Sequence, residues 1–266
     1  MQDTVGKLKF LGTGDPEGIP VAFCSCSVCL SDRNSRLRAS VLISWQGNNY
    51  VVDAGPDFRE QMLRYRINNI AGVFLTHPHY DHIGGLDDLR AWYVVHQQPV
   101  SIVLSASTYT YLSRYREHLV RAPGKDDALP SALNFTILNE DYGSSEFYGL
   151  PYSYVSYYQK SCHVTGYRFG NLAYITDLSR YDREIFSHLS GVDTLIMSAS
   201  PSEIPKAFLG RTRSHLTIRD AENFADYLGV NKLIFTHISH HLQKELDSAT
   251  GKLCAYDGME LSWMSV

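Results

Sequence analysis

Three imidazoles and a carboxylate lie within the stretch His77-Pro-His-Tyr-Asp-His82, directly after the apolar run AGVFLT. A hydrophobic core has little use for such a group, and protonated imidazoles repel one another, so these side chains are expected to face a cation. A metal needs unprotonated donors that are held in place by further hydrogen bonds. His77 and His79 share one side of an extended segment, and Asp81 and His82 follow after a turn. This one loop can therefore supply ligands to two adjacent metal positions.

A second group of potential ligands, Cys24, Cys26 and Cys29, lies in the segment FCSCSVC. Disulfides between such near neighbours would be strained, and the chain has an odd number of cysteines, five in all. The spacing therefore predicts metal binding by reduced cysteines, as in cytoplasmic proteins. Because a structural zinc prefers four tetrahedral ligands, a fourth donor must come from elsewhere in the chain.

Length, composition and charge exclude several classes of function. The 266 residues are 44% hydrophobic, which is enough to bury one large core. The net charge of −4 argues against a general nucleic-acid or membrane surface. No apolar run approaches the ~18–20 residues of a membrane span, and the N-terminal segment lacks the pattern of a secretory signal. We therefore expect a cytoplasmic protein that contacts no membrane.

The elements that would position these residues form an α/β pattern. Runs rich in Val, Ile, Tyr and Phe predict strands over residues 7–14, 39–46, 48–55, 72–77, 100–106, 133–139, 152–158, 165–171, 172–177, 193–200, 232–239 and 259–265. Helical spacing of apolar residues predicts helices over 84–97, 105–119, 180–191 and 217–230. Thr217 is expected to cap the last helix and Gly229 to end it. Residues 120–132 are expected to form a surface loop or part of a lid, within one domain spanning residues 1–266.

Metal-ligand side chains recur at the ends of apolar strands. Asp53 follows YVV, His77 follows VFLT, Asp177 follows AYIT and His237 follows LIFT. Loops that follow strand ends are where α/β proteins gather their chemistry. We therefore expect these four side chains to converge on one site.

Together these motifs resemble those of the metallo-β-lactamase-fold hydrolases. The resemblance rests on His-x-His-x-Asp-His after an apolar strand, on VVDAG around Asp53, on ITDLS around Asp177 and on FTHIS around His237. The segment GTGDPEGIP, followed by Cys-x-Cys-x-x-Cys, is most similar to the branch containing phosphoribosyl cyclic phosphate phosphodiesterase. The resemblance implies a four-layer αββα sandwich, with two divalent metals, zinc or manganese, held at one edge between the sheets.

Carried over residue by residue, the resemblance implies six ligands for the two metals: His77, His79, Asp81, His82, Asp177 and His237. The two histidines before Asp81 would bind the first metal, and Asp81 and His82 the second. Asp177 would bridge the metals and His237 would complete the second site. Asp53 would accept a hydrogen bond from a ligand imidazole, so that Asp53 and Asp81 orient the catalytic groups.

The chain departs from the family pattern at the remaining ligand of the first metal. The family usually has a histidine six or seven residues before the next Gly-Tyr, where this chain has Gln159 and Lys160. We expect a rearranged loop to bring His163 into this place, with Cys162 as a softer alternative. If neither residue reaches, the first metal would bind poorly, and the protein could be mononuclear or inactive.

The resemblance also implies roles for two histidines near the C-terminus. The related phosphodiesterases complete the cysteine site with a histidine three residues after the last active-site histidine. That residue is His240 here, with His241 as the alternative, and the result would be a structural zinc. His215 occupies the position that faces the substrate phosphate and protonates or stabilises the leaving group. Its neighbours Arg211 and Arg213 could also meet a phosphate.

The leading functional hypothesis is a phosphodiesterase that attacks a small cyclic or diester phosphate with a metal-bridged hydroxide. Two alternatives remain open. One is a non-catalytic accessory protein of cofactor biosynthesis on the same fold, which the position of His163 favours. The other is an RNA-processing nuclease, against which the acidic charge and the lack of a basic inserted arm argue. The expected partner is a small-molecule phosphodiester rather than a nucleic acid, and the resemblance allows a homodimer.

Overall fold

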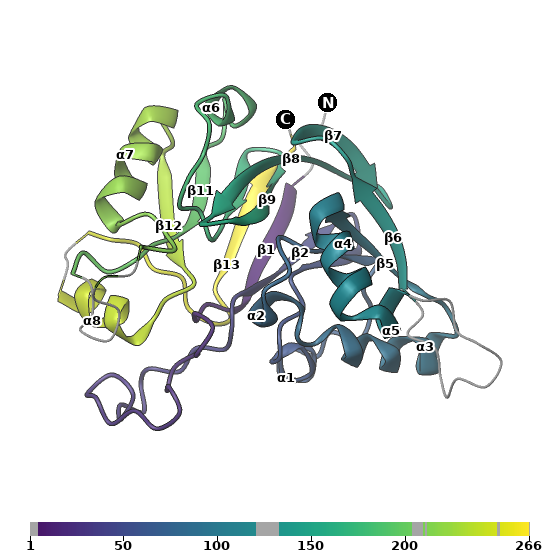
Figure 1. Ribbon diagram of the computed structural model, residues 1–266, viewed down its shortest axis with the longest axis horizontal. Helices are drawn as coiled ribbons and strands as arrows, with labels where there is room; N and C mark the ends of the chain where they lie inside the picture. Colours follow the sequence, from purple (N-terminus) through teal and green to yellow (C-terminus); the bar gives the residue numbers. More distant parts are fainter. Residues whose placement is uncertain (1–4, 121–132, 204–209, 211, 249–250, 266) are drawn as a thin grey trace.

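The computed structural model describes residues 5–120, 133–203, 210, 212–248 and 251–265 (Figure 1). Two mixed β-sheets form its centre. The first has the order β13 (Glu260–Met264), β1 (Val5–Gly12), β2 (Ser40–Trp45), β3 (Asn48–Val52), β4 (Gly72–Phe74), β5 (Val100–Ser105), β6 (Leu133–Leu138). The second has the order β12 (Lys232–Thr236), β11 (Thr194–Ser198), β10 (Leu172–Ile175), β9 (Cys162–Phe169), β8 (Leu150–Gln159), β7 (Tyr142–Phe147). The expected loop or lid falls on residues 121–132, outside the described residues.

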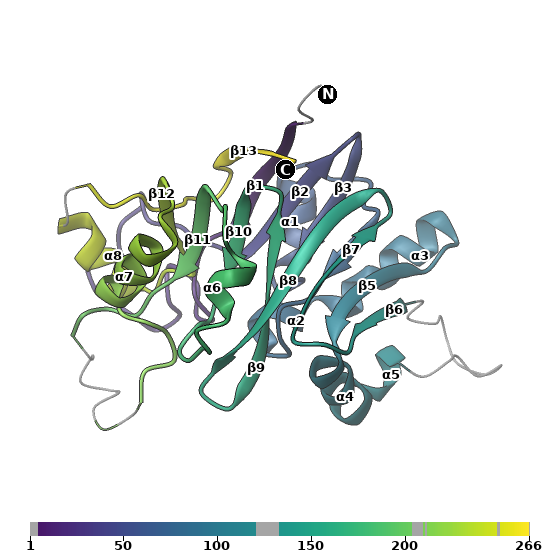
Figure 2. The same ribbon diagram turned by 90° about the horizontal axis from the view of Figure 1, so that it is seen from above.

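Helices cover the outer face of each sheet. Figures 1 and 2 show two groups at opposite sides of the molecule. Beside the first sheet lie α1 (Phe58–Arg64), α2 (Tyr80–Ile83), the 3₁₀ helix η1 (Leu86–Leu89), α3 (Arg90–His96), α4 (Ala106–Tyr115) and α5 (Glu117–Val120). Beside the second lie α6 (Ile185–His188), α7 (Ile218–Leu228) and α8 (His240–Ser248). The predicted αββα sandwich is confirmed. In the described part of the chain, no helix is long and apolar enough to cross a bilayer.

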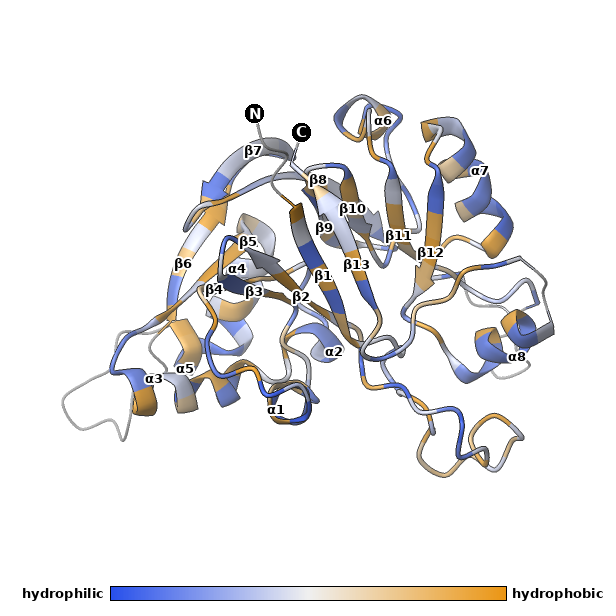
Figure 3. Cartoon of the chain, turned by 180° about the vertical axis from the view of Figure 1, so that it is seen from behind, coloured by the Kyte–Doolittle hydropathy of each residue, from blue (hydrophilic) through white to orange (hydrophobic). Residues whose placement is uncertain are grey.

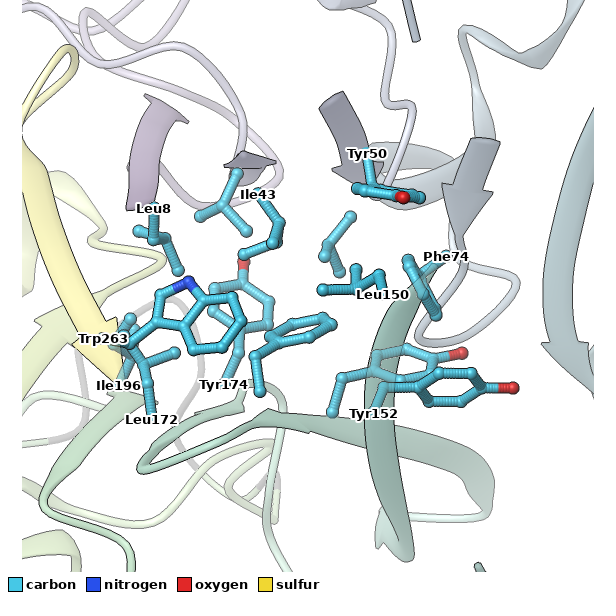
Figure 4. Close-up of a cluster of buried hydrophobic side chains, with 14 of the residues drawn as sticks. Leu8, Ile43, Tyr50, Phe74, Leu150, Tyr152, Leu172, Tyr174, Ile196 and Trp263 are labelled. Atoms are coloured by element: carbon cyan, nitrogen blue, oxygen red, sulfur yellow. The ribbon is translucent and has the colours of Figure 1, made fainter. Parts of the chain in front are cut away.

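The core between the sheets is dominated by aromatic rings. Figure 4 shows side chains of both sheets pointing toward one another across this layer. The Phe74 ring lies 5.0 Å from the rings of Tyr152 and Tyr167 and 5.1 Å from that of Phe147, in edge-to-face geometry. Such pairs each contribute about 0.5–1.5 kcal/mol beyond the burial of their area. Phe74 ends β4, so this packing also fixes the strand from which the His77 loop departs.

Helix α7 begins and ends where the sequence predicts. The Thr217 hydroxyl accepts a hydrogen bond from the Asp220 amide, and the Asp220 carboxylate accepts one from the Thr217 amide in return, which forms a capping box. Gly229 ends the helix with a left-handed φ of 69°. The helix buries Ile218 and Phe224 against the second sheet, and Figure 3 shows its apolar and polar faces. This packing holds the loop that carries His215 beside the sheet edge.

Candidate metal centre

The four strand ends that carry metal-ligand side chains meet at one edge of the sandwich. Asp53 and His77 follow the parallel strands β3 and β4, while Asp177 and His237 follow β10 and β12 of the parallel set β10–β11–β12. Asp53, Asp177 and His237 have left-handed backbone conformations, with φ values of 65°, 60° and 56°. Such conformations are costly for non-glycine residues and cluster at functional sites. Here each one turns the chain sharply where the strand ends.

His77 and His79 form one end of the cluster, called the two-histidine end below. Nε2 of His77 lies 2.9 Å from Nδ1 of His79, and the rings are edge to face. Two nitrogens about 2.0–2.1 Å from one metal ion would lie about 2.9–3.4 Å apart, depending on the coordination angle. The two imidazoles therefore fit as ligands of a common ion.

The opposite end contains Asp81, His82, Asp177 and His237 and is called the four-donor end. Oδ2 of Asp81 lies 3.0 Å from Nε2 of His82 and 3.2 Å from Nε2 of His237. The Asp177 carboxylate lies between the ends, with Oδ2 3.5 Å from Nε2 of His82 and Oδ1 3.6 Å from Nε2 of His237. All four residues are buried. The structure thus brings the six expected ligands of the two metals into one cluster.

Two buried polar atoms of this cluster lack a hydrogen-bond partner among the described residues. They are Nε2 of His82 and Oδ2 of Asp177, which face each other. An unsatisfied buried polar group costs about 1–3 kcal/mol. A cation held between these atoms would satisfy both, so the donor set fits a divalent metal.

Asp53 and Thr76 support the imidazoles from behind. Asp53 is fully buried and accepts hydrogen bonds from the amide and the hydroxyl of Thr76, at 2.8 and 2.9 Å. Oδ2 of Asp53 also lies 2.7 Å from Nδ1 of His82, so the ring donates from Nδ1 and leaves Nε2 as a free ligand atom. The Thr76 hydroxyl lies 3.0 Å from Nδ1 of His77, which turns Nε2 of that ring toward the cluster as well.

The electrostatics of the cluster also favour a cation. Burial lowers the pKa of His77 well below its ordinary value. Burial acts in the same direction on His82 and His237, but the surrounding carboxylates outweigh it. The pKa of His82 lies well above its ordinary value because of Asp81 and Asp53, and Asp177 and Asp81 raise that of His237 to about 9. A site that draws protons onto buried imidazoles is a site of negative potential, and divalent metals can take the place of those protons.

His163 lies away from the cluster, which corrects the expectation that it completes the two-histidine end. Nδ1 of His163 lies 3.3 Å from the Ser107 hydroxyl and Nε2 lies 3.1 Å from Oδ1 of Asp141, away from the cluster. Nε2 of Gln159 instead donates to Oδ1 of Asp177 at 2.6 Å. Cys162 lies nearby, but burial raises the pKa of its thiol to about 11, which opposes the thiolate form that binds metals.

His215 lies beside the four-donor end and is held by Ser198, the last residue of β11. The Ser198 hydroxyl accepts a hydrogen bond from the Asp177 amide at 2.7 Å and lies 2.9 Å from Nδ1 of His215. The Ser198 hydroxyl can therefore donate its own proton to Nδ1 of His215. Nδ1 is then the acceptor, and the ring carries its proton on Nε2. Burial lowers the pKa of His215 to about 4. The ring is consequently a neutral hydrogen-bond donor at pH 7.

A pocket of about 740 Å³ opens over the cluster. His79, His215 and His237 line it, as do Asp15 and Lys160. Oδ1 of Asp15 is buried without a hydrogen-bond partner among the described residues, and burial followed by the charge of Glu17 raises its pKa to about 8.

Arg213 lines the pocket but is not free to clamp a phosphate. Its guanidinium donates to the carbonyl oxygens of Pro201 and Ser202, the latter at 2.6 Å. The expected phosphate contact of Arg213 is therefore not supported. Arg211 lies outside the described residues.

The cysteine cluster lies on the loop after β1, which extends toward α8 in Figure 1. The sulfur atoms of Cys24, Cys26 and Cys29 lie 3.4, 3.5 and 3.4 Å from Nδ1 of His240. Tetrahedral zinc with Zn–S of about 2.3 Å and Zn–N of about 2.0–2.1 Å would place these atoms about 3.5 Å apart. The four side chains therefore fit a closed zinc site, while the ring of His241 lies tilted beside that of His240, outside the site.

Sequence reasoning missed Ser198, Thr76 and Asp15. Ser198 ends the strand TLIMS, a position like those of the four strand-end residues Asp53, His77, Asp177 and His237. It was passed over because serine is not a common metal ligand. Asp15 and Thr76 gave no comparable signal, because their importance comes from what the folded chain places beside them.

Comparisons with known proteins agree with this arrangement. A model of the family described as beta-lactamase superfamily domain matches residues 48–238. The chain is similar to a diphosphatase from the PhnP family, with 28% identity, a TM-score of 0.84 and coverage of 99% of each chain. It shares its fold with zinc-bound PqqB from Methylobacterium extorquens, at 20% identity and a TM-score of 0.73, covering 96% of this chain and 99% of that one. It also shares its fold with the short form of human tRNase Z, at 19% identity and a TM-score of 0.67, covering 96% of this chain and 98% of that one.

A curated relative, an octanoyltransferase of Porphyromonas gingivalis, is 28% identical over 257 residues, or 94% of this chain. The chain spans 50% of the length of that protein. The name of the relative therefore describes a protein about twice as long as the region that matches here.

Proposed function

The chain belongs to the beta-lactamase superfamily domain family, and on this premise we propose that it is a metal-dependent hydrolase of small phosphodiesters or diphosphates. The observation that carries the proposal is a group of six side chains beneath a pocket, called the His–Asp cluster: His77, His79, Asp81, His82, Asp177 and His237. Divalent metals, when bound there, lower the pKa of water and stabilise negative charge on a phosphoryl group. The similar diphosphatase of the PhnP family supports phosphorus rather than carbon as the atom attacked.

The residues of this chain would position the reaction in two ways. Asp53 and Thr76 hold the rings of His82 and His77 in one orientation, which lowers the entropy lost when ligands assemble. His215 is a neutral ring whose Nε2–H can donate to a phosphoryl or leaving-group oxygen as negative charge develops there. With a pKa of about 4, His215 acts as a hydrogen-bond donor and not as a protonated acid at neutral pH.

The pocket supports a small substrate. Its volume of about 740 Å³ lies within the usual range for small-molecule sites, roughly 300–1,000 Å³. Lys160 is exposed at its edge and can attract a second phosphate or a phosphate outside the reacting bond. A net charge of −4 offers little general attraction to a nucleic-acid backbone, which favours a small ester over RNA.

One observation favours a second function, that of an accessory protein that binds metal or ligand without turnover. Gln159 stands where a third ligand of the two-histidine end is expected and holds Asp177 by a hydrogen bond. A cluster with one incomplete end could bind a metal and a phosphate without hydrolysing it.

Hydrolysis of defined substrates separates the two functions. Purified protein is loaded with zinc or manganese and assayed on a chromogenic phosphodiester and on a small diphosphate. We expect metal-dependent release of product from at least one substrate, abolished by the chelator EDTA and by Asp177→Asn. A protein that retains metal in the His–Asp cluster but turns over neither substrate would contradict the hydrolase and favour the accessory function.

A further inference from the structure

The chain supplies unequal numbers of donors to the two ends of the His–Asp cluster. At the four-donor end, Asp81 lies 3.0 and 3.2 Å from the ring nitrogens of His82 and His237. Asp177 lies 3.5 and 3.6 Å from the same two nitrogens. The two-histidine end has His77 and His79 and shares the Asp177 carboxylate. Among the described residues, no further imidazole or thiolate lies beside both rings. The ring of His82 is close to that of His77, but its Nε2 faces Asp81 and Asp177.

Gln159 lines the pocket together with His79 and is bonded to the shared Asp177 carboxylate, but it offers no strong third ligand. Its side chain is 8% exposed, and its Nε2 lies 2.6 Å from Oδ1 of Asp177. A carboxylate only accepts hydrogen bonds, so the amide nitrogen of Gln159 must face it. That nitrogen has no lone pair for a metal. Its hydrogen bond engages Oδ1 of Asp177 and leaves only Oδ2 of that carboxylate without a hydrogen bond among the described residues. A carboxamide oxygen is moreover a weaker zinc ligand than an imidazole.

The β8–β9 hairpin prevents His163 from replacing Gln159. The two strands are joined by a two-residue turn at Lys160 and Ser161, with Gln159 paired to Cys162 and Tyr158 paired to His163. Paired residues share a face, and successive residues of a strand point to opposite faces. His163 can therefore reach the face of Gln159 only by a one-residue slip of the hairpin. Such a slip would exchange the two buried faces of β9, which pack Tyr167 and Phe169 into one core and Val164 into another.

We infer that the His–Asp cluster binds two divalent ions unequally, tightly at the four-donor end and weakly at the two-histidine end, because Gln159 replaces the third ligand. The inference rests on the proposed function in taking the cluster as a metal centre, but it concerns occupancy and not turnover. It gives the protein two tightly held ions, one here and one at the cysteine cluster. A third ion would bind about 10–100-fold more weakly than the ion at the four-donor end.

Metal titration tests this inference. The protein is stripped with a chelator and titrated with zinc against a competing chromogenic chelator, and tightly held ions are counted by elemental analysis after gel filtration. Cobalt spectra separate thiolate ligation at the cysteine cluster from nitrogen and oxygen ligation at the other. Wild type should retain two tight ions. Gln159→His should retain three, with the affinity for the last ion raised about 10–100-fold.

Two control variants isolate the role of the side chain. Gln159→Ala removes the hydrogen bond to Asp177 without adding a donor and should not gain a third tight ion. His163→Gln should change neither the number nor the affinity of the ions. Three equally tight ions in wild type, or loss of an ion in His163→Gln, would overturn the inference, and so would a folded Gln159→His that still holds two. Two tight ions without hydrolysis would instead overturn the proposed function and leave the inference intact.

Discussion

The cysteine cluster and the His–Asp cluster differ in both the type and the arrangement of their donors. At the cysteine cluster, three thiols surround one imidazole nitrogen at 3.4–3.5 Å, which completes a tetrahedron of protein ligands. At the His–Asp cluster the donors belong to three overlapping sets, two of which share Asp177, beneath a pocket. A filled tetrahedron leaves no position for substrate, whereas an open one does. The difference between a structural and a chemical site therefore lies in whether the donors leave an open position as well as in their type.

The two clusters also differ in what holds their ligands. The cysteines lie on a loop, where backbone hydrogen bonds such as that from the Leu30 amide to the Cys26 carbonyl provide local order. The His–Asp ligands follow strands of two packed sheets and are supported by the buried Asp53 and Thr76. We expect the sheets to preform the His–Asp cluster, whereas the cysteine loop depends on its own metal for its shape.

The largest expected effect comes from Asp177→Asn. This change removes the charge that both ends of the His–Asp cluster share, so hydrolysis should fall by roughly 10³-fold or more, the scale lost when charge stabilisation in an active site is removed. The variant should also lose metal from this cluster. Elemental analysis should still find one zinc at the cysteine cluster. Loss of metal from both clusters together would show that they are coupled, which contradicts the expectation that each cluster is held independently.

Asp15 connects the two regions, because it lies on the cysteine-bearing loop while its carboxyl group faces the pocket. Burial, and then the charge of Glu17, raises its pKa to about 8. The folded state therefore keeps a proton that the unfolded state releases near pH 4, so stability falls as the pH rises from about 4 through about 8. In metal-free protein, Asp15→Asn should remove this loss and raise the free energy of unfolding at pH 9 by roughly 2–3 kcal/mol, allowing for partial exposure.

Denaturant unfolding between pH 5 and pH 9 measures this effect. The exposed Asp32 on the same loop provides the matched control, and Asp32→Asn should leave the pH dependence as in wild type. A pH dependence that persists unchanged in Asp15→Asn would show that another group causes it.

Cys26→Ser tests whether the cysteine cluster is structural. Serine is a poor zinc ligand, so the variant should lose one zinc and loosen the loop, including Asp15 at the pocket edge. Hydrolysis should fall about tenfold, the lower range for changes that support a metal site indirectly. The effect should appear mainly in KM, because the His–Asp ligands are held by the sheets. Cys254→Ser is the control, since that cysteine lies outside both clusters. A loss as large as that of Asp177→Asn would contradict a purely structural role.

Sequence patterns predicted the fold well where burial was regular. Strand propensity located every strand in the described residues except β7, whose sequence YGSSEF is polar and poor in β-branched residues. Helix α7 was predicted to its caps. Helices α1, α2 and α8 were missed because each spans fewer than ten residues, too few for a helical period to stand out in the sequence.

The site was predictable where a metal-ligand side chain directly follows an apolar strand. Asp53, His77, Asp177 and His237 were found because metal-ligand side chains stood at strand ends. His163 was misplaced because its face depends on the register of the β8–β9 hairpin, which a single sequence does not reveal. The position of Ser198 at a strand end is visible in the sequence, but its hydrogen bonds are not, because they depend on the parallel pairing of β10 with β11.

Ser198→Ala is expected to give the smallest effect on the rate of hydrolysis, and it tests the groups that orient His215 beside the His–Asp cluster. Without the hydroxyl, Nδ1 of His215 loses its partner, so the ring can rotate and can carry its proton on either nitrogen. The value of kcat should fall several-fold, by about the free energy of one hydrogen bond, ~0.5–1.5 kcal/mol, with KM and metal content unchanged. Ser198→Thr keeps the hydroxyl and should restore most of the rate.

The pH profile separates positioning from a merely structural role for Ser198. In wild type, the pKa of His215 lies at about 4, so this ring should cause no loss of rate between pH 8 and pH 6. In Ser198→Ala the vacated space can admit water, and the pKa of His215 should rise toward its ordinary value as the ring becomes better solvated. The mutant rate should then change between pH 7 and pH 5, where the wild-type contribution of this ring is flat. A profile identical in shape to wild type would mean that Ser198 supports β11 alone and that His215 is oriented by its proximity to Asp177.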